Sequence, residues 1–224
     1  MLDLKSHDNL LNELRERDPE SVLDGPVVTE LYALAPTRIL WILREPNGVG
    51  PWDLRESLAD FRKLSSYSKW QATSGLLARV SHGLVSGLPR WGAWADEAQN
   101  CVPALRSVAV ININKHGGKE RVEWNKLFEA SRKFEDLLER QIEMLDPHVV
   151  IFTCGPNLLP TAVRNRLCDF SDSGCAVQRE GTTVWIRAYH PNQRTISHEE
   201  YYEQVRKALM SCDLFPGCEE RDAP

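Results

Sequence analysis

The feature that most constrains the fold is a set of four short runs that are apolar at consecutive positions. A half-exposed strand alternates apolar and polar residues, whereas a strand buried on both faces has no polar side. Segments with the spacing of amphipathic helices separate most of these runs. We therefore expect parallel strands covered by helices on both faces, at residues 37–43, 107–112, 148–153 and 183–188.

This alternation predicts an α/β fold, a three-layer α/β/α sandwich with a central, mainly parallel four-stranded sheet. The 224 residues suffice for one well-buried core, so we expect a single domain, 1–224. Within it, residues 1–36 are expected to form a helical N-terminal extension. Residues 212–224 are polar and proline-containing, and we expect a flexible tail there.

Helical periodicity is found in three further places. Apolar positions recur at helical spacing within 54–64 and 76–84, and a crossover helix is expected over 127–145, where Pro147 ends it. Ser197-His198-Glu199-Glu200 has the pattern of a capping box, which predicts a closing helix. The segment 87–103 is expected to be an irregular loop, in which Trp91 and Trp94 either pack against the core or stack on a base.

Charge and cysteine content exclude some classes of function. The 27 basic and 32 acidic residues give a net charge of -5, which excludes a globally basic nucleic-acid coat but still allows a local cationic groove. The six cysteines contain no C-x-x-C pair, so neither a zinc ribbon nor an iron–sulfur cluster is indicated. We expect reduced structural thiols, no bound metal and no cofactor.

The N-terminal residues are polar and acidic where a secretory signal would need a basic start and an apolar run. No segment approaches the roughly 20 apolar residues that span a bilayer. We therefore expect a cytoplasmic protein without a membrane partner, and we expect it to act as a monomer.

Polar residues follow the first and the last of the predicted strands. The first strand continues into Arg44-Glu45-Pro46-Asn47-Gly48, and the last is followed by His190-Pro191-Asn192. In an open α/β sheet, ligands usually bind at the carboxyl ends of the strands. We therefore expect the carboxylate of Glu45 and the imidazole of His190 to face one pocket.

These two segments resemble the motifs of the uracil-DNA glycosylase superfamily. In that family the first strand ends in G-Q-D-P-Y-H, G-I-N-P-G or G-E-A-P-G, and the last strand ends in H-P-S or N-P-S. The corresponding residues here are Leu43 to Gly48 and His190 to Arg194. The resemblance covers about residues 37–205 and implies a uracil-DNA glycosylase-like fold that acts on DNA.

The resemblance implies catalytic roles for Glu45 and His190. Glu45 falls where the uracil-specific branch carries the aspartate that positions water or stabilises the cationic sugar. Its extra methylene is a departure, since a misplacement of ~1 Å can reduce the rate on the order of a hundredfold. His190 matches the histidine that hydrogen-bonds the base O2. Alternatively, Glu45 caps a helix or pairs with Arg44 or Arg55, and His190 is structural.

The segment after the second strand resembles the family's L-L-L-N, whose asparagine reads the flipped pyrimidine. Asn112 or Asn114 would serve here, with Asn112 ranked first, because an amide offers both a donor and an acceptor. The alternative is an asparagine that shapes a turn. Lys115 and Lys119, beside two glycines, are expected to contact DNA phosphate. Lys115 is also the only lysine in these motifs that could form a Schiff base.

Two residues after the first strand bear on the choice of base. Asn47 stands where the uracil-specific branch has a tyrosine that blocks C5 substituents, so the resemblance implies room for a base modified at C5. Trp52 is expected to lie under the flipped base, and core packing is the alternative.

The segment after the last strand is expected to contact DNA through Asn192 and Arg194. Arg194 matches the position of the family's leucine that enters the base stack, and its guanidinium could stack or contact phosphate. The alternative is a salt bridge to Glu199 or Glu200.

The leading hypothesis from the sequence is a monofunctional DNA glycosylase that flips a pyrimidine and hydrolyses its N-glycosidic bond, leaving an abasic site. The base would be uracil or a C5-modified pyrimidine, in DNA repair or in defence against foreign phage DNA. One alternative is a catalytically inactive glycosylase-like module that binds nucleic acid, nucleotide or protein. Another is an enzyme that acts on free nucleosides, which the acidic net charge favours.

Overall fold

A computed structural model describes residues 1–48, 50–60, 73–118, 122–167 and 175–211 of the chain. Its centre is a mixed six-stranded sheet with the strand order β1-β3-β2-β4-β6-β5. The strands are β1 (Gly25–Pro26), β2 (Ile39–Leu43), β3 (Ala109–Asn112), β4 (Val149–Phe152), β5 (Ala176–Glu180) and β6 (Thr183–Arg187).

The four central strands are parallel, and they are the four predicted apolar runs. In the middle of the sheet Trp41 of β2 is paired with Val110 of β3 on one side and with Ile151 of β4 on the other. β6 joins β4 in the same direction, with Val150 paired to Trp185. All residues of β2, β3 and β4 are buried, which explains why their sequences contain apolar residues on both faces.

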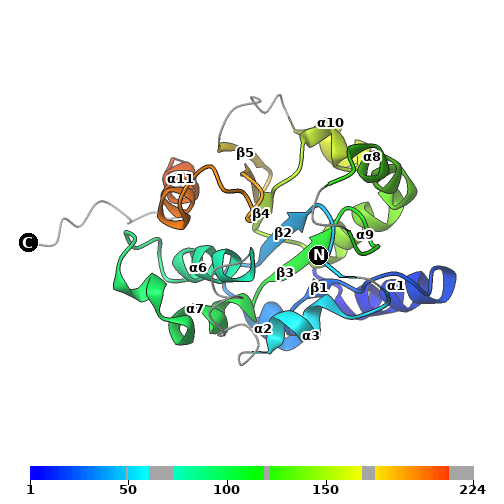
Figure 1. The fold of residues 1–224 in the computed structure, drawn as a ribbon, viewed down its shortest axis with the longest axis horizontal. Helices are drawn as coiled ribbons and strands as arrows, with labels where there is room; N and C mark the ends of the chain where they lie inside the picture. The colour runs from blue at the N-terminus through cyan, green and yellow to red at the C-terminus, as the bar shows by residue number, and fades with distance from the viewer. Residues whose placement is uncertain (49, 61–72, 119–121, 168–174, 212–224) are drawn as a thin grey trace, which may run out of the picture.

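Helices cover both faces of the sheet, as Figure 1 shows. The core that contains Trp41 is closed by α6 (Thr73–Val85), α7 (Ala98–Leu105) and α11 (His198–Met210), with α3 (Leu54–Ala59) at its margin. The core that contains Leu40 is closed by α1 (Leu4–Arg17), α2 (Thr29–Leu34), α8 (Trp124–Lys133), α9 (Glu135–Leu145) and α10 (Thr161–Arg166). Adjacent residues of β2 thus face opposite cores, and the predicted α/β class is confirmed.

The predicted four-stranded sheet is wrong in one respect, because two antiparallel edge strands were missed. β1 pairs with β3 through Gly25 and Val110, and β5 pairs with β6 through Ala176 and Arg187. β1 has only two residues, and β5 is only partly buried, so neither has the apolar run of a central strand. β1 also shows that residues 1–36 are more than a helical extension, because they supply one edge of the sheet.

Two other segments differ from the prediction. The expected crossover helix over 127–145 is two helices, α8 and α9, which meet at Phe134. The expected irregular loop over 87–103 contains a short 3-10 helix, η1 (Ala93–Asp96), and most of α7. There Trp91 and Trp94 pack against each other and against Tyr202, with ring centroids 5.4 to 5.8 Å apart, so the packing alternative is the one observed.

The closing helix is present as expected. α11 begins after Ser197, whose Oγ accepts a hydrogen bond from the backbone N–H of Glu200 at 3.1 Å. Cys101, Cys154 and Cys175 are free thiols. In the described ranges, every helix is too short or too polar to cross a bilayer. The predicted helix beyond residue 60, the tail 212–224 and the other three cysteines lie outside the described residues.

Candidate active site

The carboxyl ends of the four parallel strands bring the predicted site segments to one edge of the sheet. Ladder hydrogen bonds continue past the strand ends: Ile113 N donates to Leu43 O at 2.9 Å, and Asn114 N donates to Arg44 O at 2.8 Å. On the other side, Ala188 N donates to Phe152 O at 3.0 Å. The residues that follow β2, β3, β4 and β6 therefore start from fixed backbone positions.

Glu45 belongs to the segment that follows β2, and its side chain lies against the segment that follows β3. Gly118 N donates to Pro46 O at 2.8 Å, and a Cβ added to Gly118 would lie 2.3 Å from the carboxyl carbon of Glu45. The Glu45 side chain thus rests on bare backbone. Burial raises the pKa of Glu45, while a hydrogen bond from the Asn114 side chain and the charge of Arg44 oppose that rise.

The orientation of the Asn114 amide follows from its second partner. Its Oδ1 accepts a hydrogen bond from His116 N at 3.0 Å, so its NH₂ group is the part that remains to donate to Glu45. Asn114 is therefore placed beside the candidate catalytic carboxylate.

His190 has a defined protonation state and tautomer. Its Nδ1 accepts a hydrogen bond from Asn192 N at 3.1 Å, so the proton of the neutral ring lies on Nε2. Burial, assisted by the positive charge of Arg44, lowers the pKa of His190 to about 3. At neutral pH the ring is uncharged and Nε2–H is a hydrogen-bond donor.

Glu45 and His190 share the carboxyl edge but not adjacent strands. β4 lies between β2 and β6, so the two strands are about 10 Å apart, two spacings of just under 5 Å. Arg44, which directly follows β2, was not predicted as part of the site. Its charge acts on Glu45, on Cys154 after β4 and on His190 after β6.

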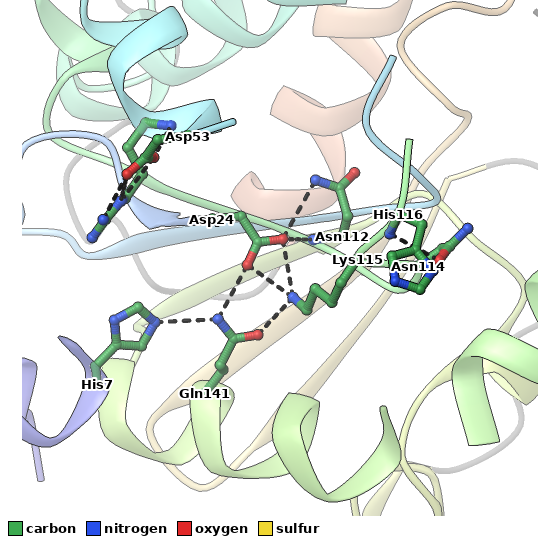
Figure 2. A network of polar contacts seen from close by, with 9 residues as sticks. His7, Asp24, Asp53, Asn112, Asn114, Lys115, His116 and Gln141 are labelled. Atoms are coloured by element: carbon green, nitrogen blue, oxygen red, sulfur yellow. Dashed lines mark hydrogen bonds and ion pairs between the residues drawn. The ribbon is translucent and has the colours of Figure 1, made fainter. Parts of the chain in front are cut away.

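Asn112 and Lys115 belong to a buried polar network rather than to an exposed surface (Figure 2). Lys115 Nζ donates to both carboxylate oxygens of Asp24, at 2.8 and 2.9 Å, and to Gln141 Oε1 at 2.7 Å. Gln141 Nε2 lies 3.1 Å from Asp24 Oδ1 and 3.3 Å from His7 Nε2. His7, Asp24, Asn112, Lys115 and Gln141 are each at most 1% exposed.

This network corrects the prediction for Lys115. A side chain that is 0% exposed and bonded to a buried carboxylate cannot contact DNA phosphate in this arrangement. Burial also lowers the pKa of Lys115, and the charge and hydrogen bonds of Asp24 oppose that effect. No local pattern in the sequence indicates this pairing, because Asp24 lies 91 residues away from Lys115.

Asn112 is anchored to the same carboxylate. Its backbone N–H donates to Asp24 Oδ2 at 2.7 Å, and its side-chain Nδ2 lies 3.5 Å from the same oxygen. Its Oδ1 is buried without a hydrogen-bond partner in the described part of the chain. Asn112 therefore keeps an unused acceptor at the end of β3.

Asn47 and Trp52 lie on the turn after Glu45. Asn47 is exposed and forms an isolated parallel bridge with Gly118. Trp52 is partly buried, and its indole lies 3.3 Å from where a Cβ of Gly48 would be. Gly48 has a φ of 139°, a backbone conformation that favours glycine, so this turn is shaped by a residue without a side chain.

The predicted DNA-contact residues after β6 are on the surface. Asn192 and Arg194 are exposed, and Arg194 forms no ion pair with Glu199 or Glu200, all of which the structure describes. The salt-bridge alternative is thus not observed. Lys119 lies outside the described residues.

Within the described ranges, no group of three or more His, Cys, Asp and Glu side chains is placed to hold a metal ion. In comparisons with known proteins, no family model and no curated protein matches this sequence.

Proposed function

We propose that this protein is a monofunctional DNA glycosylase, similar to uracil-DNA glycosylases, that hydrolyses the N-glycosidic bond of a flipped pyrimidine. The observation that carries the proposal is the neutral His190 ring, whose Nδ1 is occupied by Asn192 N, at the same sheet edge as the carboxylate of Glu45. The imidazole of His190 is suited to stabilise the leaving base, and the carboxylate of Glu45 is suited to stabilise the cation that develops on the sugar.

In this mechanism Glu45 acts on the sugar. Cleavage of the bond to the base passes through an oxocarbenium-like state, and a carboxylate beside C1′ stabilises it and accepts a proton from the attacking water. Asn114 holds the carboxylate, and Gly118 gives it room.

In the same step His190 acts on the base. Its Nε2–H donates to the O2 of the pyrimidine as negative charge develops there. A neutral donor suits this role, because it stays in the same protonation state throughout the neutral pH range.

For substrate class we propose uracil or a pyrimidine modified at C5. Asn47 is exposed and smaller than the tyrosine it replaces in the resemblance, so a C5 substituent would meet an amide rather than an aromatic wall. Asn112, ranked first from the sequence as the residue that reads the base, is 1% exposed and bonded to buried Asp24, so it does not meet the base edge in this arrangement.

The test is base release from oligonucleotides that carry uracil, thymine, cytosine and C5-modified pyrimidines. Abasic sites are revealed by strand cleavage in alkali. Wild type should release at least one base, while Glu45→Gln and His190→Ala should each be slower on the order of a hundredfold. Glu16→Gln on the exposed face of α1 is the charge-matched control and should keep the wild-type rate.

Two outcomes would contradict the proposal. Binding of DNA without release of any base would instead favour the inactive binding module. Trapping of a covalent protein–DNA complex by borohydride would show an amine nucleophile and overturn the water-based mechanism.

A further inference from the structure

The segment 113–118, which follows β3, supports the carboxylate of Glu45. Its residues Asn114 and Gly118 donate backbone hydrogen bonds, both at 2.8 Å, to the carbonyl oxygens of the residues before and after Glu45. At Gly118 the Glu45 side chain also lies against bare backbone, because a Cβ there would be 2.3 to 2.5 Å from its Cγ, carboxyl carbon and Oε1. A shift of this segment would therefore move Glu45.

The segment 18–24, between α1 and β1, holds the supporting segment from its other side. Val22 N donates to Lys115 O at 2.7 Å, and the Asp24 carboxylate accepts a hydrogen bond from Asn112 N, also at 2.7 Å. β1 begins only after Asp24, so at the end of β3 a carboxylate takes the place of a neighbouring strand. The backbone on which Glu45 rests is thus bonded to residues of the protein interior.

Lys115 adds a side-chain network to these backbone bonds (Figure 2). The three N–H groups of its ammonium have three acceptors within 2.9 Å, which are both Asp24 oxygens and Gln141 Oε1. Apolar side chains of similar size often stabilise a buried site as well as an ion pair does, but their packing has little directional preference. Hydrogen bonds between charged groups fix direction as well as distance, and a fully satisfied network is rigid.

We propose that Asp24 and Lys115 are positioning residues that hold the segment 113–118 and, through Asn114 and Gly118, the carboxylate of Glu45. This inference rests on the proposed glycosylase function and extends its site to buried residues that touch neither base nor sugar. A glutamate has one more rotatable bond than an aspartate, so its carboxylate needs more support to stay beside C1′. The buried network supplies that support from the interior of the protein.

The first test compares single-turnover base release in two backgrounds. Asp24→Asn combined with Lys115→Met removes both buried charges together, so the net charge near Glu45 stays the same. In the wild-type background this double variant should be slower by about tenfold or more, because a displacement of ~1 Å at a catalytic group can cost on the order of a hundredfold. In the Glu45→Gln background the same double change should alter the rate by less than about twofold, because the carboxylate that it positions is already absent.

Residues that only maintain the fold would behave differently in this comparison. Loss of folded protein, or distortion of the whole sheet edge, would slow the wild-type and the Glu45→Gln backgrounds by the same factor. Circular dichroism and urea denaturation give the folded fraction of each variant, and each rate is expressed per folded protein.

The second test measures the pKa of Glu45 and needs no turnover. The NMR shift of its carboxyl carbon is followed with pH in protein labelled at glutamate, and the signal is identified by its absence from Glu45→Gln. The hydrogen bond from Asn114 lowers this pKa, so the pKa should be higher in the double variant, in which Asn114 is no longer held. The charged groups that act on Glu45 are Arg44, Glu123 and Lys126, and all three remain in the variant.

The ion pair of Arg38 and Asp146 provides the matched control. Its two charged groups lie 2.8 Å apart, in residues that precede β2 and β4, at the opposite end of the parallel strands from Glu45. Arg38→Met combined with Asp146→Asn should leave both the rate per folded protein and the pKa of Glu45 unchanged.

Gln141→Leu is a milder variant of the network. It keeps Asp24 and Lys115 but removes one acceptor of the lysine and one donor to the aspartate. Both the rate and the pKa of Glu45 should change in the same direction as in the double variant, by smaller amounts. Should the double variant fail to fold, Gln141→Leu decides by the same two measurements.

The outcomes separate this inference from the function that it extends. Equal slowing in the two backgrounds, or an unchanged rate and an unchanged Glu45 pKa in the folded network variants, would overturn the positioning role and leave the glycosylase function standing. Failure of wild type to release any base would overturn the glycosylase function, while a higher Glu45 pKa in the double variant would still show that Asp24 and Lys115 position the carboxylate.

Discussion

Gly118 offers the most direct test of how Glu45 is held. A methyl group at this position would lie 2.3 Å from the Glu45 carboxyl carbon, so the side chain would have to move. We expect Gly118→Ala to slow base release on the order of a hundredfold, as a displacement of ~1 Å at a catalytic group can do. Single-turnover rates on the best substrate of the oligonucleotide panel measure this.

Gly92 provides the matched control for this substitution. A Cβ at Gly92 meets its nearest atom, a ring carbon of Trp94, at 3.8 Å, which is ordinary contact. Gly92→Ala should leave the rate unchanged. A Gly118→Ala protein with the wild-type rate would show that the position of Glu45 does not matter for the reaction.

The sequence predicted the candidate site residues that directly follow a buried strand. Glu45 and His190 stand out because polar residues there interrupt apolar runs, and the parallel sheet then places both at one edge. Arg44 was considered only as a partner of Glu45, because its position relative to β4 and β6 depends on strand order. Lys115 was predicted to be exposed, because a lysine beside glycines has the pattern of a surface loop, but its side chain is buried.

The contact between β1, β3 and α9 depends on the buried pair of Lys115 and Asp24. Replacing one member leaves the other charge buried without its partner, which in proteins costs about 3–5 kcal/mol. We expect Lys115→Met to lower the free energy of unfolding by that amount, measured by urea denaturation with an unchanged m-value.

Lys126 serves as the control for Lys115. It is 64% exposed and pairs with Glu123 three residues earlier, at 2.7 Å. Lys126→Met should change the free energy of unfolding by less than about 1 kcal/mol. Combining Lys115→Met with Asp24→Asn should recover part of the loss, since the unpaired charge is then removed; a double variant less stable than Lys115→Met would contradict this account.

The helices and strands that were predicted correctly are those whose apolar spacing in the sequence matches the side chains that are buried in the structure. The central strands and α6 follow directly from their apolar patterns, whereas the break at Phe134 does not, because apolar spacing continues through it from Leu127 to Leu138. The edge strand β5 was missed because its side chains are only partly buried, so its pattern has no continuous apolar run.

The folded protein resists protonation of His7 and His190. Burial lowers the pKa of His7 to about 4 and that of His190 to about 3, from an ordinary 6.5. Below pH 6.5 the unfolded chain binds these protons and the folded chain does not, so stability should fall as the pH drops from 6.5 toward 4. His7 alone contributes a loss of about 3 kcal/mol over that window.

Urea denaturation at pH 7 and pH 4.5 measures this loss. His7→Asn removes the titrating group, so its stability should depend less on pH across this window, even though the variant is less stable at pH 7. The charged groups that act on His7 are Asp24, Asp8, Lys115 and Arg55, and all four remain in the variant. An equally steep loss in His7→Asn would assign the acid sensitivity to other groups.

Neither edge strand of the sheet, β1 or β5, is suited to pairing with a strand of another molecule. β1 is two residues long and ends in Pro26, which has no N–H to offer a passing strand, and β5 carries Gln178, Arg179 and Glu180 along its outer border. Neither edge therefore offers a long, flat, apolar strand with which a strand of a neighbouring molecule could form hydrogen bonds. Growth into cross-β fibrils by addition of strands to these two edges of the folded protein is therefore disfavoured.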